Sequence, residues 1–243
     1  MSFSNWRGTV GLIKPTMRPG SMEETVRLLP KGVGLIPIHQ NVQRGSKDEF
    51  ENAIKGYDDN AVVLANAGAE LIHHSGTPPF MMLGVEGEKK IIRKWEREMG
   101  VPHFTANQNI TNALKAVHAR KIIGVSYSRL QNDLTRDYMT EAGFAVLAME
   151  PLEVPFEKAG EIPPEQVYKL VNDTFVANPT AEAIYLQGNA WRLLSIVEMM
   201  ERDFAVPVIE TCAALCWEIQ DRLHIREPRD GVGVLLRELP KRG

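Results

Sequence analysis

The sequence is poor in the features that mark unusual classes of protein. It has two cysteines in 243 residues, too few for a disulfide framework. No apolar run approaches the roughly 18 residues that a membrane-spanning helix needs. Lys and Arg number 28 against 31 Asp and Glu, so the formal net charge is −3 and no basic excess favours nucleic acid. We expect a globular protein with no nucleic-acid or membrane partner.

The N-terminal residues lack the basic start, apolar run and small-residue cleavage site of a signal peptide. This indicates a cytoplasmic protein, in which Cys212 and Cys216 would be free thiols because the compartment is reducing. No pair of histidines or cysteines has metal-ligand spacing with a third ligand nearby, and Gly32-Val33-Gly34 precedes an expected strand instead of following it. We therefore expect neither a metal nor a nucleotide cofactor.

One stretch of the chain occurs twice. Residues 69–77 and 181–189 each form a short apolar run that ends at a glycine, Gly76 or Gly188, as a buried strand opening into a turn would. Residues 10–15 and 123–128, and residues 101–104 and 206–209, repeat in the same order at nearly the same spacing. A period this long indicates a duplicated domain. We predict a first lobe of residues 1–117 plus 213–243 and a second lobe of residues 118–212.

Expected strands and helices alternate along the whole chain. Ser46 and Glu49 have the spacing of a capping box and open a helix that we extend to about Gly68, with a possible break at Gly56. The alternation predicts an α/β fold with two similar lobes, each a parallel sheet flanked by helices, related by a pseudo-twofold duplication. Strands are expected at residues 9–13, 33–38, 102–104, 121–125, 145–149 and 206–209, and within the two copies of the repeated stretch, residues 69–77 and 181–189.

Ligands of parallel sheets bind beyond the carboxyl ends of the strands. If a pseudo-twofold relates the lobes, the strand tips of both should face one cleft. The tip residues are Pro15, His39, residues 75–78, residues 126–128, residues 187–190 and residues 210–212.

These segments, taken in order, resemble the aspartate/glutamate racemase superfamily, and within it the branch of maleate cis-trans isomerase and arylmalonate decarboxylase. The resemblance covers nearly the whole chain. It rests on residues 11–15, on Ser75-Gly76-Thr77, on Ser126-Tyr127 with Asn132, and on Leu186-Gln187-Gly188 with Val206-Pro207-Val208.

The resemblance implies one or two cysteines at the paired tips, which move a proton at the carbon beside a carboxylate. The corresponding positions here are Gly76 and Gly188, so neither tip can supply a thiol. The resemblance also implies that Thr77, Tyr127 and Asn189, with nearby backbone N–H groups, form the pocket for the carboxylate and the enediolate; Pro15, Gly76 and Gly188 would line it. Pro78 departs from the pattern, since the decarboxylase has a hydroxyl residue there.

The adjacent histidines His73 and His74 point to opposite faces of a strand, so one could reach the cleft and act as the missing acid or base. The alternative is that both are buried packing residues. His39, at another tip, is the next candidate. Cys212 could approach the substrate from the last strand or supply a relocated thiol, although a buried free thiol is the commoner fate of cysteine. Glu210 at the same tip is a possible acid.

The sequence thus predicts a cofactor-independent enzyme acting beside the carboxylate of a small mono- or dicarboxylic acid. Decarboxylation or another lyase step fits the missing cysteines best. An isomerase with a non-cysteine base and a non-catalytic carboxylate-binding protein remain as alternatives. The resemblance further implies a homo-oligomer.

Overall fold

A computed structural model describes residues 4–242. The chain divides into two compact units. The first unit comprises the described residues up to Arg18 and residues 29–108, and the second comprises residues 19–28 and the described residues from Asn109 onward. No helix among the described residues is long and apolar enough to cross a membrane.

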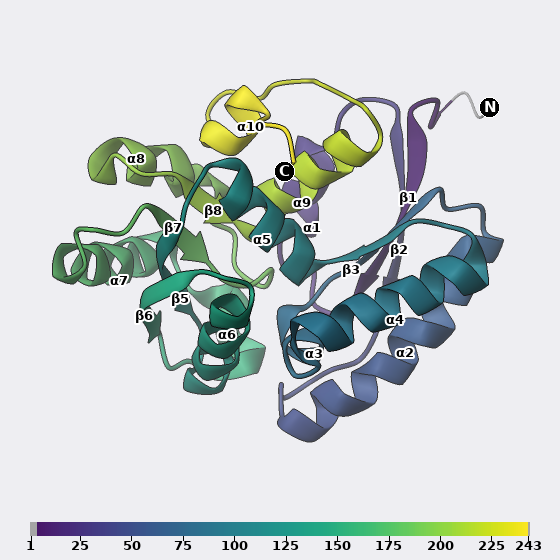
Figure 1. The fold of residues 1–243 in the computed structure, drawn as a ribbon, viewed down its shortest axis with the longest axis horizontal. Helices are drawn as coiled ribbons and strands as arrows, with labels where there is room; N and C mark the ends of the chain where they lie inside the picture. Colours follow the sequence, from purple (N-terminus) through teal and green to yellow (C-terminus); the bar gives the residue numbers. More distant parts are fainter. Residues whose placement is uncertain (1–3, 243) are drawn as a thin grey trace. The chain divides into compact units, whose positions relative to one another are not determined.

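Each unit contains one sheet of four parallel strands (Figure 1). The sheet of the first unit has the strand order β2-β1-β3-β4 and that of the second has the order β6-β5-β7-β8. Since the order along the chain and across the sheet is the same in both, the predicted duplication is confirmed. The strands are β1 (Gly8–Lys14), β2 (Val33–His39), β3 (Leu71–His74), β4 (His103–Thr105), β5 (Lys121–Ser126), β6 (Ala145–Pro151), β7 (Ala183–Leu186) and β8 (Val208–Glu210).

Helices flank both sheets, as the alternating pattern predicts. In the first unit α2 packs on β1 and β3 and also contacts α4, while in the second α7 packs on β5 and contacts α8. The helices are α1 (Met22–Leu28), α2 (Lys47–Asn66), α3 (Thr77–Met81), α4 (Gly84–Met99), α5 (Ala106–Ala116), α6 (Arg129–Glu141), α7 (Pro164–Ala177), α8 (Leu194–Phe204), α9 (Thr211–Arg222) and α10 (Val234–Glu238), with a 3-10 turn η1 at Phe156–Glu161.

The duplication extends to individual hydrogen bonds. The carboxylate of Glu70, just before β3, accepts from the backbone N–H of Thr9 at 2.9 Å. The carboxylate of Glu182, just before β7, accepts in the same way from Lys121 at 3.0 Å. A carboxylate therefore satisfies the same backbone donor near the start of the central strand in each unit.

Helix α2 begins at the predicted capping box. The Ser46 hydroxyl accepts from the Glu49 N–H, and the Glu49 carboxylate accepts from the Ser46 N–H, each at 3.3 Å. The possible break at Gly56 does not occur. A Cβ at Gly56 would lie 2.8 Å from Oε1 of Gln40, so the glycine permits a close approach within a continuous helix.

The boundaries of the two units differ from those of the predicted lobes. Helices α9 and α10, expected to return to the first lobe, belong to the second unit, and so does α1. The reason is packing: α1 and α10 both contact α9. The hydroxyl of Thr25 on α1 lies 3.2 Å from the sulfur of Cys212 on α9.

Candidate functional site

In the first unit, strand β3 ends in a tip that has no room for a side chain. Gly76 has a φ of 95°, a conformation that L side chains rarely adopt. A Cβ there would lie 2.8 Å from Cγ of Pro15 and 2.9 Å from the hydroxyl oxygen of Tyr57. Pro15 and Gly76 are therefore in contact, as expected of residues at one tip. Tyr57, in the middle of α2, was not predicted to be near it.

Thr77 follows Gly76 as the first residue of α3 and is buried. Its carbonyl oxygen accepts from the Asn107 side-chain amide at 3.3 Å. Asn107 is also fully buried and was missed by the sequence analysis. It stands two residues after the end of β4, as Cys212 does after β8, so the internal repeat could have pointed to it.

His74 lies in an aromatic cluster of the first unit. Its ring stacks on Trp95 with centroids 4.2 Å apart, and its Nε2 lies 2.9 Å from Nδ1 of His103. Burial, helped by the neighbouring His103 and His73, holds the pKa of His74 well below its usual range, and burial lowers the pKa of His103 to about 4. A neutral imidazole enclosed in this way packs the core, which argues against the predicted catalytic role of His74.

The other two histidine candidates are also engaged by their own unit. His73 is buried, its ring packs against Phe104 with centroids 4.6 Å apart, and its Nδ1 lies 3.1 Å from the Ser75 hydroxyl. The Nδ1 of His39 lies 2.8 Å from the Thr16 carbonyl oxygen. Each contact fixes a ring orientation at a strand end.

In the second unit, the tip after β7 is filled by a phenol. Gly188 has a φ of 119°, and a Cβ there would lie 1.7 Å from the hydroxyl oxygen of Tyr127 and 2.2 Å from its Cζ. The Tyr127 ring packs edge-on against Trp191, with centroids 4.7 Å apart. Its hydroxyl oxygen accepts from the backbone N–H of Ala190 at 3.2 Å. Tyr127 and Gly188 are thus brought together, and the hydroxyl occupies the volume of the missing side chain.

The backbone around Gly188 is held from several sides. The N–H of Gly188 donates to the Thr211 hydroxyl at 3.2 Å, and its carbonyl accepts from the Trp191 indole at 3.0 Å. The carbonyl of Asn189 accepts from the N–H of Ser21 at 3.0 Å. Among the described residues nothing pairs with the side-chain amide of Asn189, which is partly exposed. This amide is a donor available at the tip.

Cys212 is buried at the start of α9, with its sulfur against Thr25. Burial first, and then the nearby Cys216 and Glu210, hold the pKa of its thiol well above the usual range. A neutral, enclosed thiol is a poor nucleophile, so this position does not favour a substrate-contacting or relocated catalytic cysteine.

Glu210 begins α9 by accepting from the backbone N–H groups of Cys212 and Ala213, at 2.8 and 2.9 Å. The side chain is fully buried, and burial raises its pKa to about 8 despite these two bonds; the charge of Glu24 adds to the rise. Glu210 is therefore a neutral acid near pH 7, embedded behind the tip beside the buried Tyr185, whose pKa burial also raises.

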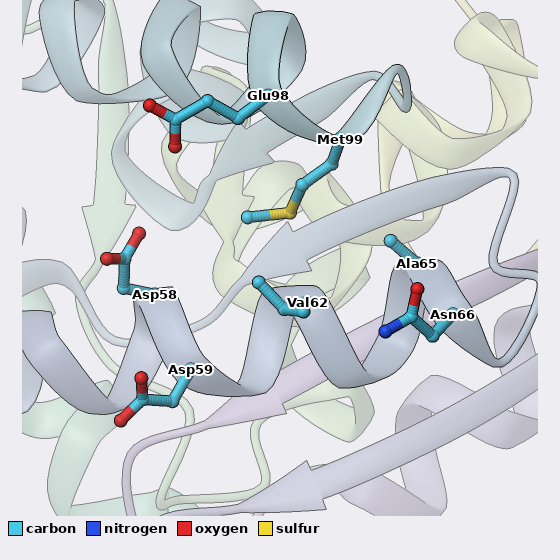
Figure 2. Close-up of a pocket in the computed structure, with 7 residues that line it drawn as sticks. All are labelled: Asp58, Asp59, Val62, Ala65, Asn66, Glu98 and Met99. Carbon is cyan, nitrogen blue, oxygen red and sulfur yellow. The ribbon is translucent and has the colours of Figure 1, made fainter.

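A surface pocket of about 320 Å³ lies elsewhere, between α2 and α4 of the first unit (Figure 2). Asp58, Asp59 and Glu98 are among the residues that line it. Lys94 lies 3.4 Å from Asp58 and 3.7 Å from Glu98, so part of this charge is compensated. The pocket includes none of the predicted site residues, and no group of three or more candidate metal ligands occurs in the described part of the chain.

The architecture is that of several solved enzymes. Maleate isomerase from Pseudomonas putida S16 is 18% identical with a TM-score of 0.86, covering 96% of this chain and 99% of its own. Maleate cis-trans isomerase of Nocardia farcinica, bound to TRIS, is 19% identical with a TM-score of 0.88, covering 95% and 98%. A crystal structure of arylmalonate decarboxylase is 21% identical with a TM-score of 0.82, covering 95% and 99%. At these identities the likeness shows a shared fold with two similar lobes.

The family model of arylmalonate decarboxylase matches residues 10–236. The chain therefore belongs to the arylmalonate decarboxylase family, as the ordered tip motifs indicate. Among curated protein sequences, none matches the chain.

Proposed function

We propose that the protein is a cofactor-independent enzyme that acts beside the carboxylate of a small mono- or dicarboxylic acid, by decarboxylation or another lyase step. One observation carries the reaction type: both tip glycines have their side-chain space filled, and both cysteines of the chain are buried in α9. The family model over residues 10–236 supports the class of enzyme.

The substrate carboxylate would be held by uncharged donors. The unpartnered amide of Asn189 and the hydroxyl of Tyr127 are the donors that we propose at the tip of the second unit, and Thr77 is the donor that we propose at the tip of the first. Such donors stabilise the negative charge that develops when CO2 leaves, because they are already oriented before the reaction begins. Removing one donor of this kind typically costs about 10²–10³ in rate.

Isomerisation through a thiol adduct is less compatible with this chain. One structure of the Nocardia farcinica isomerase contains a covalently bound succinylcysteine intermediate. Here Cys212 and Cys216 are both buried, and the pKa of the Cys212 thiol is raised, so a thiolate is disfavoured. Decarboxylation needs no covalent adduct and so accommodates the two glycines.

The test is proton NMR in D2O of the purified protein with malonates, maleate, aspartate, glutamate and hydroxy acids. Loss of CO2 from a malonate supports the proposal. Isomerisation of maleate would replace the lyase assignment with an isomerase that uses a non-cysteine base. The double variant Thr77→Ala with Tyr127→Phe should lose nearly all turnover, and full turnover by this variant would refute the assigned pocket.

A carboxylate-binding protein without catalysis is the second candidate. One observation favours it: the backbone N–H groups of Gly188 and Ala190 at the second tip already donate to the hydroxyls of Thr211 and Tyr127. These two donors are therefore engaged within the protein. Broadening of ligand lines with no conversion of any acid would select it. We also propose a cytoplasmic homo-oligomer, which size-exclusion chromatography with light scattering can test.

A further inference from the structure

The loop that follows β7 depends on a distant helix. We call residues 187–193, between β7 and α8, the tip loop. Helix α8 begins at Leu194, and the residue before it, Leu193, has no side chain that can cap a helix. The N–H of Leu194 is instead satisfied by Glu24 of α1, whose Oε1 accepts from it at 3.3 Å. The cap of α8 therefore comes from a residue 170 positions earlier in the chain.

Residues 20–24 also touch the backbone of the tip loop. The N–H of Ser21 donates to the carbonyl oxygen of Asn189 at 3.0 Å. Gly20 has a φ of 49°, and a Cβ there would collide with the same carbonyl oxygen, so a glycine is what lets the two backbones approach. Residues 20–24 thus form a clamp on the tip loop, and the clamp and the loop both belong to the second unit.

The helix after the first tip begins differently. Pro78 and Pro79 stand in the first turn of α3, and proline has no N–H. Two of the backbone donors that the start of a helix leaves unpaired are therefore absent from α3. Helix α8 has no proline in its first turn, so its donors need acceptors, and Glu24 supplies one of them.

A second buried carboxyl group lies near Glu24. Glu210 uses its Oε2 to accept from two N–H groups at the start of α9, and its Oε1 has no partner among the described residues. The neutral acid therefore carries its proton on Oε1. Glu24 is the charged member of the pair near pH 7, because its charge, after burial, is among the causes that raise the pKa of Glu210 to about 8. Ionisation of Glu210 puts a second negative charge near the first among buried side chains.

Other charged and titratable groups face the two carboxyls from β7, α9, the tip loop and α1. They are Tyr185, Cys212, Arg192, Arg27 and Glu23. Burial holds the pKa of the phenol and that of the thiol well above their usual ranges, so both stay neutral at pH 8. The arginines keep their charge throughout this range, and they attract Glu24 while Glu210 is neutral. The transition near pH 8 therefore belongs to Glu210.

We propose that Glu24 is a positioning residue for the tip loop, and that the proton on Glu210 keeps Glu24 in place. While Glu210 is neutral, Glu24 caps α8 and the tip loop holds the Asn189 amide in one position. When Glu210 ionises, repulsion moves Glu24 away from the Leu194 N–H, and the loop loses its cap. The inference rests on the proposed function only in assigning Asn189 to the substrate; the clamp itself is a property of the second unit.

Trp191 reports on the tip loop, because its ring is fully buried there and its indole N–H donates to the carbonyl oxygen of Gly188. The probe is fluorine NMR, without substrate, of protein in which 5-fluorotryptophan replaces the four tryptophans. The variant Trp191→Phe assigns the signal. Between about pH 6 and 9 the Trp191 signal should shift in one step with its midpoint near pH 8, below the range in which tyrosines ordinarily titrate.

Three variants separate the roles of the two carboxyls. Glu24→Gln keeps an oxygen for the Leu194 N–H but carries no charge, so the loop should stay held and the step near pH 8 should vanish. Glu210→Gln should also remove the step. Glu24→Ala removes the acceptor, and hydrogen exchange of the Leu194 N–H should become about 2–30-fold faster at neutral pH, the usual effect of losing a cap.

The matched control is Glu23→Gln, on the same helix. Glu23 pairs with Arg192 of the tip loop at 2.5 Å, but both side chains are exposed, and such pairs stabilise little. This variant should leave both the step near pH 8 and the exchange of Leu194 unchanged.

Each part of the inference can be refuted separately. A step that persists in Glu24→Gln is a direct effect of the Glu210 charge on the probe and overturns the role of the proton, as does the absence of a step in the unmutated protein. Unchanged exchange of Leu194 in Glu24→Ala overturns the positioning role. Should Glu24→Ala fail to fold, the step in the unmutated protein and its loss in Glu24→Gln decide the matter.

The link to the reaction has its own readout. If a malonate is converted, kcat should fall above pH 8 in the unmutated protein but not in Glu210→Gln, and equal falls would overturn control of the site by the clamp. If no acid is converted, the proposed function fails, while the fluorine and exchange measurements still decide whether the clamp exists.

Discussion

Replacing Gly188 with alanine tests the packing on which the second tip depends. The new Cβ would lie 1.7 Å from the Tyr127 oxygen, far inside van der Waals contact, so the ring or the loop must move. Displacing packed groups in this way typically costs about 1–3 kcal/mol. A side chain at a φ of 119° adds about 1–3 kcal/mol of backbone strain. We expect Gly188→Ala to lower the free energy of unfolding by about 2–6 kcal/mol.

Gly143→Ala is the matched control, because Gly143 also has a positive φ, 96°, but no atom lies within 4 Å of its ideal Cβ position. It should show the backbone term alone, about 1–3 kcal/mol. Urea unfolding followed by circular dichroism measures both variants and the unmutated protein. The difference between the variants isolates the collision with Tyr127.

A double-mutant cycle completes the test. Tyr127→Ala creates a cavity and destabilises by itself, but it also removes the atoms that the new methyl group at position 188 would strike. The loss caused by Gly188→Ala should therefore shrink by about 1–3 kcal/mol in the Tyr127→Ala background. If Gly188→Ala costs no more than Gly143→Ala, or the two losses simply add, the phenol does not fill the side-chain space of residue 188.

Buried charge and helix capping give three further tests. Because the pKa of Glu210 is about 8 in the folded state and about 4.5 in the unfolded state, the folded state keeps a proton that the unfolded state loses, and the free energy of unfolding should fall as the pH rises from 4.5 to 8. In urea titrations, Glu210→Gln should flatten this slope by up to about 1.4 kcal/mol per pH unit. An unchanged slope would contradict the burial of Glu210. The lowered pKa of His103, about 4, has the opposite sign: stability should fall as pH drops from 6.5 to 4, and NMR should show the His103 ring unprotonated at pH 5.5. Ser46→Ala should lower the free energy of unfolding by about 0.5–2 kcal/mol, whereas Ser46→Thr should keep most of the stability because its hydroxyl can still cap the helix. Equal losses of stability in the two variants would show that the capping hydrogen bond does not stabilise α2.

The strands and their tips can be predicted from the sequence because local residue patterns specify both. The apolar runs before Gly76 and Gly188 predict β3 and β7. The repeat predicts two similar lobes, and the two sheets do share one strand order. The capping box at Ser46 correctly predicts the residue at which α2 begins. Each of these signals lies within a few positions of the element that it specifies.

The sequence does not predict which side chains fill the space beside the two tip glycines. Tyr57 reaches the space beside Gly76 from the middle of α2, and its identity as the occupant depends on how the helix packs on the sheet. Whether His74 faces ligand or core depends on Trp95 and His103, which come from later elements. The predicted lobe limits differ from the two units for the same reason, since α1 joins the second unit through contacts that no local pattern announces.

The membership of α1 in the second unit has a consequence during synthesis on the ribosome. Thr25 meets Cys212, a partner 187 positions further along the chain. At the usual 5–20 residues per second, α1 leaves the ribosome about 10–40 s before that partner exists. Meanwhile the strands of the first sheet are made on either side of it. A nascent chain stalled before α9 would therefore carry an exposed α1, and a second half translated as a separate polypeptide would lack the segment that covers Cys212 and holds the loop after Gly188.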